Sequence, residues 1–490
     1  MISKTKSHDT LAVEKLLFWG ILLSYSYFFS AGEWNQISRY NLIFTLVEPH
    51  TVEAPLFSID RFIESPKHNF NTGDWAIHNG HYYSNKAPGS ALLAAPFYAL
   101  LYFIEVTFFN IMPQDPLITI FNAWLINIFV SILPMALSAV CFFRINLRQN
   151  NDVKKSLILT LLCYFSTLLF PYSSSLWGLT TCSAFLIIAL YNLLVSPSRQ
   201  SNLVLGLTLG LAVLTEYIAI VVVLAIGIFF FRRIKLHRLL QILLGALLPL
   251  LLYLFYHWTC FETPWLPATF FNNPEFKEQT KAYGQFAGID LQALLGLLIS
   301  NRYGIFVHMP FLLLSLFGFW KWHKSRNDQA LMWTLFSSII IFLLINASFH
   351  GWHGGFVVGA RYQIPVIPFY VLGLNFLPNK IRYTNLLSLL GVFSFVNMLV
   401  INSVTPIYVI KNSQHLGLYE YYLRFIASDI ATRTYHVRLT FPDYKPIQDM
   451  HTFNFGELMS LQGLSTLIPF YLLTFLLLLL LRKILRENFS

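Results

Sequence analysis

Residues 203–231 read LVLGLTLGLAVLTEYIAIVVVLAIGIFFF, an apolar run of 29 residues with a single carboxylate, Glu216, near its middle. A helix needs roughly 20 apolar residues to cross a hydrocarbon core about 30 Å thick. The run therefore predicts a membrane-spanning segment. An ionisable group inside a membrane is costly and often functional, which makes Glu216 a candidate site residue; a structural hydrogen bond to a neighbouring helix is the alternative.

Apolar runs of this kind recur from one end of the chain to the other. Of the 490 residues, 56% are apolar and only 11% are charged, whereas a soluble domain carries about 25% charged residues. This composition excludes a soluble globular fold and predicts an all-α polytopic membrane protein with about twelve transmembrane helices, within a range of about 11–13. The expected crossings are 16–31, 90–110, 117–143, 156–172, 176–195, 203–231, 239–258, 304–320, 330–349, 363–378, 385–403 and 465–482.

The net charge of +10 comes mainly from Lys and Arg in short loops between the apolar runs. That placement favours membrane topology over nucleic-acid binding. With the N-terminus in the cytoplasm, the basic loop at 144–155 would lie outside. It returns to the cytoplasm if 90–110 does not fully cross and 203–231 forms two short helices. The remaining basic segments fall on the cytoplasmic side in either case: 232–238, 321–326, 380–382 and 482–486.

Three long polar segments, 32–89, 259–303 and 404–464, are predicted on the outer face. Connections of this length are usually functional or disordered, and their content of Trp, Tyr, Phe and Pro argues against disorder. The expected organisation is a transmembrane module over 1–403, an extracytoplasmic segment over 404–464, and a final helix with a cytoplasmic tail over 465–490.

The first outer loop collects several acids and a lysine. Glu33 directly follows the first apolar run, and Asp60 and Asp74 come later in the same loop. An enzyme that joins a sugar to a hydroxyl needs a carboxylate to take the proton of the acceptor and cations against the departing phosphate. Lys86, which precedes a turn rich in Pro and Gly, suits the second role. Helix capping and interfacial anchoring are the simpler explanations of these residues.

Two arginines and two histidines stand near the other outer segments. Arg302 and Arg361 lie where loops return to the membrane, and the guanidinium fork suits a lipid phosphate; interface anchoring is the alternative. His350 and His353 could share a helix face and hold a metal, but the glycines after them favour a loop that a ligand can approach. The four cysteines lack the paired spacing of a zinc site.

Several short motifs resemble a known family. They are GEW at 32–34, DWA at 74–76, GHYYSNKAPG at 80–89, LTEY at 214–217, NRYG at 301–304, WHGG at 352–355 and GARY at 359–362. With these motifs the chain resembles the GT-C superfamily of polytopic glycosyltransferases, particularly bacterial members similar to protein O-mannosyltransferases and lipid A aminoarabinose transferases.

The resemblance implies a GT-C-like architecture with a helical first extracytoplasmic loop, an acidic motif after the first helix and a Lys-Pro element before the second. It implies a carboxylate base and a set of substrate-binding residues around it. The candidate catalytic residues are Glu33, Asp74 and Asp60, and the candidate substrate-binding residues are Lys86, His81, Tyr82, Tyr83, Glu216, Arg302, His353 and Arg361.

The chain departs from the family pattern in two places. Many relatives carry an acidic pair after the first helix, whereas this chain has the single acid Glu33, so that Asp74 competes for the role of base. Several members place an acid in the second short outer loop, but residues 172–181 contain none. A divalent metal is therefore not favoured, and no cofactor is predicted.

These observations predict an enzyme that transfers a hexosyl or pentosyl group, with inversion, from a polyprenyl-phosphate donor to an envelope lipid, glycan or protein. We expect the active site on the extracytoplasmic face of a bacterial inner membrane and no nucleic-acid partner. One alternative is a polysaccharide polymerase or O-antigen ligase, which uses a diphosphate-linked donor. Another is a non-catalytic flippase or transporter, which should place ionisable residues near mid-membrane around broken helices.

Overall fold

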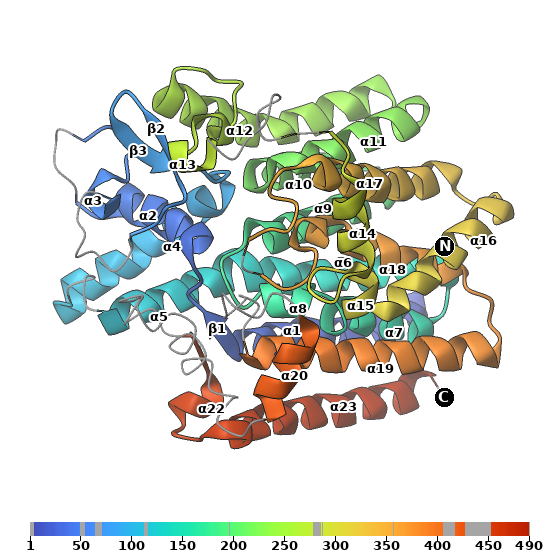
Figure 1. Cartoon of the computed structure of the whole chain (residues 1–490). Coiled ribbons are helices and arrows are strands. Elements are labelled where there is room, and N and C mark those ends of the chain that lie inside the picture. The colour runs from blue at the N-terminus through green and yellow to red at the C-terminus, as the bar shows by residue number, and fades with distance from the viewer. Residues whose placement is uncertain are drawn as a thin grey trace.

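The computed structural model of the chain is built almost entirely of helices, and both termini lie on the same side of the molecule (Figure 1). Two short antiparallel sheets of two strands each accompany the helices in the part that the structure describes. The predicted helical membrane fold is thus confirmed in its class. The structure describes residues 4–49, 54–63, 71–111, 116–195, 197–277, 286, 288–355, 357–404, 417–426 and 452–489.

Six helices within these residues are long and apolar enough to cross a membrane. The sequence predicted about twelve crossings, and several of these consist of shorter helices in the structure. Glu216 separates two helices within 203–231, and Pro310 begins a 3₁₀ turn within 304–320. The six spans are Gly89–Phe109, Ile118–Asn150, Leu236–Phe261, Gln329–Ser348, Ile381–Val404 and Gly463–Glu487.

The first helix, α1 (Lys4–Ser26), ends before the predicted residue 31. The chain continues as strand β1 (Phe28–Ser30), which pairs antiparallel with β4 (Thr452–Asn454). The Ser30 backbone N–H also donates to the Ser174 carbonyl at 2.8 Å. The helical prediction for residues 28–30 was therefore wrong, because a distant strand satisfies their backbone groups.

The first outer segment contains helix α2 (Trp34–Val47), the short helix α3 (Asp60–Ile63) and a hairpin of β2 (Trp75–His78) and β3 (His81–Ser84). Asn79 and Gly80, which form the turn, have positive φ values of 50° and 84°, as expected for an Asn-Gly hairpin turn. The segment that was expected to be helical therefore contains two helices and, in addition, this hairpin. Helix α4 (Gly89–Ile104) follows directly.

The basic loop at 144–155 lies beside the N-terminal half of α1. Helix α5 (Pro116–Asn127) and helix α6 (Leu133–Asn150) run antiparallel to α1, since Trp124 Nε1 donates to the Ser26 carbonyl at 3.2 Å while Arg144 Nη2 pairs with Glu14 at 2.6 Å. The loop after α6 is therefore at the same end of the molecule as the N-terminus. This agrees with the alternative topology, which returns that loop to the cytoplasmic side.

The run at 203–231 forms two helices, α10 (Arg199–Thr215) and α11 (Ile220–Phe230). Helix α10 runs parallel to α12 (Leu236–Phe261), because Gly206 packs against Ile242 and Gly210 packs against Pro249. Such small residues let two membrane helices approach closely. Helix α11 must then return the chain from the end of α10 to the start of α12, so this run forms two helices, as in the alternative topology.

The other basic loops gather at this same end. Lys155 Nζ donates to the Asn375 carbonyl at 2.8 Å, and Arg233 pairs with Asp328 at 2.7 Å. The remaining longer helices are α7 (Val153–Phe165), α9 (Gly178–Leu194), α14 (Leu291–Ile299), α16 (Leu313–Ser325), α17 (Gln329–Ser348), α19 (Ile381–Val404), α20 (Leu418–Ile426) and α23 (Ile468–Phe489). Most of the predicted extracytoplasmic segment 404–464 lies outside the described residues.

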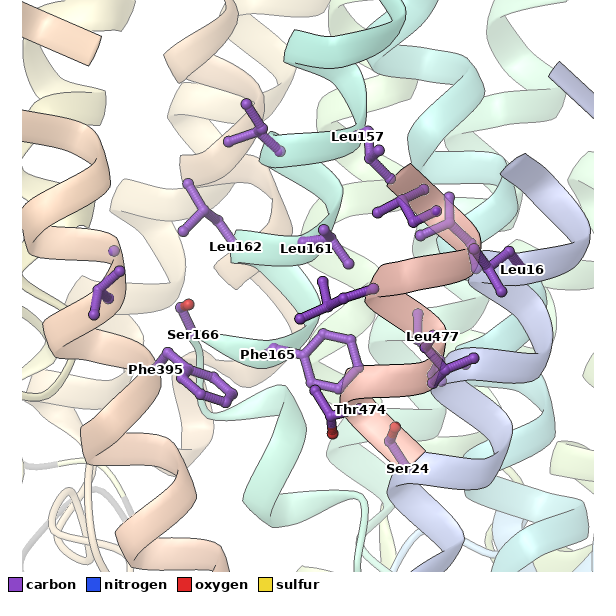
Figure 2. Close-up of a pocket in the computed structure, with 18 of the residues that line it drawn as sticks. Leu16, Ser24, Leu157, Leu161, Leu162, Phe165, Ser166, Phe395, Thr474 and Leu477 are labelled. Carbon is purple, nitrogen blue, oxygen red and sulfur yellow. The ribbon is translucent and has the colours of Figure 1, made fainter. Parts of the chain in front are cut away.

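An apolar groove of about 460 Å³ lies between α1, α7, α19 and α23. Figure 2 shows Leu16 and Leu157 toward one end of it and Ser24 and Thr474 toward the other. Its walls are mostly Leu, Ile, Val and Phe side chains. We refer to it as the apolar groove, in contrast to the polar pocket described next.

Candidate functional site

A polar pocket of about 330 Å³ lies where α2, the end of the β2–β3 hairpin, the start of α9 and the break between α10 and α11 meet. Four of the predicted site residues line it: Asp74, Lys86, Glu216 and Arg361. The other lining residues are Asn35, Arg39, Asn85, Ala87, Trp177, Leu179, Tyr217, Thr269, Asn272, Phe349, His350, Gly351, Gly354, Gly355 and Tyr362.

The hairpin brings Asp74 and Lys86 together. Asp74 directly precedes β2 and Lys86 closely follows β3, and the pairing of Trp75 with Ser84 closes the distance between these ends. Lys86 Nζ lies 2.7 Å from Asp74 Oδ2, with each side chain less than one fifth exposed. The Asn-Gly turn thus brings together two residues that are twelve positions apart, and they form an ion pair on the pocket wall.

A second ion pair joins Glu216 to Arg39 at 2.8 Å. Arg39 comes from α2 and is buried at 4% side-chain exposure, and its Nη1 also donates to the Ala87 carbonyl at 3.3 Å. Helix α9 begins at Gly178 directly against this pair, where a side chain would meet Glu216 Oε1. Glu216 therefore makes the structural contact to a neighbouring helix that was considered as the alternative. It also lines the pocket.

Arg361 also lines the pocket and lies over an aromatic ring. Its guanidinium is 4.9 Å from the centroid of the Trp177 ring, and its Nη2 donates to the Tyr362 hydroxyl at 2.9 Å. Gly354 passes so close that a Cβ there would come within 2.7 Å of Arg361 Nε. The absence of a side chain at Gly354 thus lets the loop backbone lie against the guanidinium.

Glu33 lies at the N-terminus of α2, near this pocket but not among its lining residues. Its backbone N–H donates to Gln36 Oε1 at 3.0 Å, and its own Oε1 is buried without a hydrogen-bond partner among the described residues. Burial raises the pKa of Glu33 from 4.5 to about 8; Arg361 opposes this shift and Asp74 adds to it. Near neutral pH the Glu33 carboxyl is therefore mostly protonated.

The raised pKa of Glu33 predicts a pH-dependent stability. The folded chain keeps this proton while the unfolded chain releases it, so stability is fully present below about pH 4.5 and is lost as the pH rises to about 8. Glu33→Gln should flatten this slope in thermal unfolding of the purified protein, measured from about pH 5 to about pH 9. Equal slopes for the wild type and the variant would contradict the assignment.

Asp60, His81, Tyr82 and Tyr83 were predicted as site residues, but the structure does not place them on the pocket lining. Asp60 Oδ1 accepts the Tyr82 backbone N–H at 2.6 Å, and Asp60 Oδ2 lies 2.8 Å from His81 Nδ1. Tyr83 is buried and packs edge-on against Phe261. Asp60 thus holds the hairpin to α3 through the His81 side chain and the Tyr82 backbone.

Arg302 and His353 also lie off the lining. The Arg302 guanidinium is 5.0 Å from the centroid of the Tyr303 ring, and His353 Nδ1 accepts the Gly355 backbone N–H at 2.9 Å. Burial lowers the pKa of His353, and the nearby charges of Arg302 and Arg361 lower it further. In the described part of the chain, no three or more His, Cys, Asp or Glu side chains form a group that could hold a metal ion.

Two residues of the lining were missed by the sequence interpretation. Arg39 is separated from Glu216 by 177 positions, and nothing in α2 alone identifies its partner. Trp177 lies in the segment 172–181, which was inspected only for acids. A signal for Arg39 exists in hindsight, since it is a lone cation inside a mostly apolar stretch of α2.

Fold and pocket together define a polytopic helical membrane protein with a polar, ion-paired pocket at the end opposite its basic loops. No family model and no curated protein match the chain. Among solved structures it is similar to the crystal structure of ArnT from Cupriavidus metallidurans bound to undecaprenyl phosphate, with 16% sequence identity and a TM-score of 0.45. The alignment covers 89% of this chain and 70% of that one.

Proposed function

We propose that the polar pocket transfers a sugar from a polyprenyl-phosphate donor to a hydroxyl group of an envelope lipid, glycan or protein, with inversion at the anomeric carbon. One observation carries the proposal: the hairpin residues Asp74 and Lys86 line the same pocket as Glu216 and Arg361, which come from two distant segments. A carboxylate beside cations is the arrangement that such a transfer needs.

In the proposed reaction, Asp74 accepts the proton of the acceptor hydroxyl. The acceptor oxygen attacks the anomeric carbon as the bond from that carbon to the phosphate oxygen breaks, and the phosphate leaves with the bonding electrons. Lys86 and Arg361 stabilise the charge that develops on the phosphate. A single displacement of this kind inverts the configuration. Because Lys86 pairs with Asp74 at 2.7 Å in the unliganded pocket, an arriving phosphate competes for Lys86 and leaves Asp74 available to the acceptor.

Asp74 is the acid that fits the role of base best. Glu33 has a pKa raised to about 8 and therefore holds its proton near neutral pH. Asp60 is committed to the hairpin through Tyr82 and His81. Glu216 is engaged with the buried Arg39 guanidinium, which favours a role in shaping the pocket.

The charge of the lining favours a monophosphate donor. Arg39, Lys86 and Arg361 contribute three positive charges, and Asp74 and Glu216 contribute two negative charges, so 3 − 2 gives these five side chains a net charge of +1. A sugar linked through a monophosphate is a phosphodiester with one negative charge, which this net charge neutralises. A diphosphate-linked donor would bring a second negative charge that the net charge of +1 does not neutralise, which weighs against a polymerase or O-antigen ligase.

Topology supports the outer face as the place of reaction. The basic loops gather at the end that carries the N-terminus, and basic loops mark the cytoplasmic side. The pocket lies at the opposite end, since the 17-residue α10 separates Glu216 from that end by roughly 25 Å. Glu216 lies at a break between two helices, which is where a transporter would place an ionisable residue. This break, however, is at the pocket, and the Glu216 carboxylate is paired with Arg39.

A transfer assay tests the proposal. Membranes containing the protein would be supplied with labelled sugars on polyprenyl monophosphate or on polyprenyl diphosphate, together with envelope extracts as acceptors. We expect label to leave the monophosphate donors only, and membranes with Asp74→Asn serve as the matched control. Product from diphosphate donors alone, or no product from any donor in the panel, would overturn the proposal.

A further inference from the structure

Four buried polar atoms of the pocket lining have no hydrogen-bond partner among the described residues. They are Trp177 Nε1, Arg361 Nε, Asn85 Oδ1 and Asn272 Oδ1. Trp177 and Asn85 are only 3% and 4% exposed. Buried polar groups in folded proteins are nearly always paired, so four unpaired ones in the lining of one pocket indicate that a ligand supplies missing partners.

Trp177 is held rigidly in place. Its backbone N–H donates to the Ser175 carbonyl at 2.8 Å, and its own carbonyl accepts the Thr180 hydroxyl at 3.0 Å. Its ring packs against the Arg361 guanidinium at 4.9 Å and against the Tyr172 ring at 5.3 Å. With the ring covered by these neighbours, the polar edge of the indole is the part that remains for a ligand.

The polar edge of the indole can pair with only one kind of group, a hydrogen-bond acceptor. An indole N–H can only donate, and so can the Nε–H of an arginine. The Arg361 guanidinium lies over the indole ring, so the two unpaired donors are close together. Two neighbouring fixed donors, one of them cationic, suit a group that presents several acceptor oxygens and a negative charge, which describes a phosphate.

We propose that Trp177 is a substrate-binding residue whose Nε1–H donates, together with Arg361 Nε–H, to the phosphate oxygens of the polyprenyl-phosphate donor. The start of α9 adds to this subsite, because Trp177 is the residue before its first turn and no side chain caps that turn. The backbone N–H groups at a helix start favour an anion. The inference rests on the proposed function for the identity of the ligand.

Trp177→Phe tests the inference, since phenylalanine keeps an aromatic ring under Arg361 and removes only the donor edge. The probe is undecaprenyl phosphate without a sugar, measured by native mass spectrometry and compared with the sugar-loaded lipid. Loss of a hydrogen bond to a charged group should weaken binding of both lipids roughly 10- to 100-fold. The unfolding temperature of the unliganded variant should stay equal to or rise above that of the wild type, because a buried unpaired donor is gone.

Tyr172→Phe is the control, because the Tyr172 hydroxyl donates to the Val358 carbonyl at 2.7 Å and Tyr172 is not among the lining residues of the pocket. It should lower the unfolding temperature and leave lipid affinity within about twofold of wild type. Equal affinities of the Trp177→Phe variant and the wild type would overturn the inference. So would weaker binding of the sugar-loaded lipid alone, which would assign the donor to a sugar oxygen, or a fall in unfolding temperature like that of the control. Failure of the wild type to bind undecaprenyl phosphate would instead overturn the proposed function.

Discussion

Asp74→Asn should lower the turnover number of sugar transfer by about 100- to 10,000-fold, the range that a general base contributes. The amide keeps the size of the side chain but cannot take the proton of the acceptor hydroxyl. Asp74 and Lys86 are each less than one fifth exposed. Loss of their ion pair should therefore cost more folding free energy than the roughly 0–1 kcal/mol of an exposed pair and less than the roughly 3–5 kcal/mol of a fully buried one. Thermal unfolding measured alongside the transfer assay should show that the inactive protein is still folded.

Glu33→Gln provides the comparison for this prediction. Glu33 is the other acid near the pocket, and its raised pKa keeps it protonated near neutral pH. Its amide variant resembles that protonated form, so transfer should remain within about tenfold of wild type. An inactive Glu33→Gln protein together with an active Asp74→Asn protein would move the role of base to Glu33.

Arg39→Met should destabilise the folded protein by about 3–5 kcal/mol, because it leaves the Glu216 carboxylate without its partner in a desolvated place. The pair is nearly buried, with side-chain exposures of 4% and 19%. Chemical unfolding in detergent would measure the effect. The double variant Arg39→Met/Glu216→Leu should recover most of the loss, since replacing both partners of a buried ion pair is often close to neutral.

Arg233→Gln is the matched control for charge removal. It breaks the ion pair between Arg233 and Asp328, whose side chains are 52% and 27% exposed respectively. An exposed ion pair contributes about 0–1 kcal/mol to the folding free energy. If Arg39→Met destabilised the protein no more than Arg233→Gln, the ion pair with Glu216 would not be the element that holds α2 against the break between α10 and α11.

The membrane fold could be predicted from the sequence because long apolar runs are stable only where lipid surrounds them. The division of those runs into separate helices could not be predicted. At the break, the Glu216 carboxylate pairs with the Arg39 guanidinium. Arg39 belongs to α2, which is distant from Glu216 in the sequence. Likewise, β1 replaces the end of the first helix because it pairs with β4, more than 400 residues later.

The candidate site was predictable in part, and the reason differs from residue to residue. Asp74 and Lys86 were identified as chemistry-bearing residues, and the Asn-Gly turn between them was a signal for the hairpin that pairs them. Asp60 was identified on the same grounds, but its carboxylate is used by the hairpin backbone. Trp177 was missed because an indole donor becomes informative only when its burial and its missing partner are known.

The most direct test is an experimental structure of the protein with undecaprenyl phosphate bound. Our account predicts that the phosphate lies in the polar pocket, with its oxygens within about 3 Å of Lys86 Nζ and of Arg361. A phosphate bound elsewhere while the polar pocket stays empty, for example at a mouth of the apolar groove between α1, α7, α19 and α23, would contradict it.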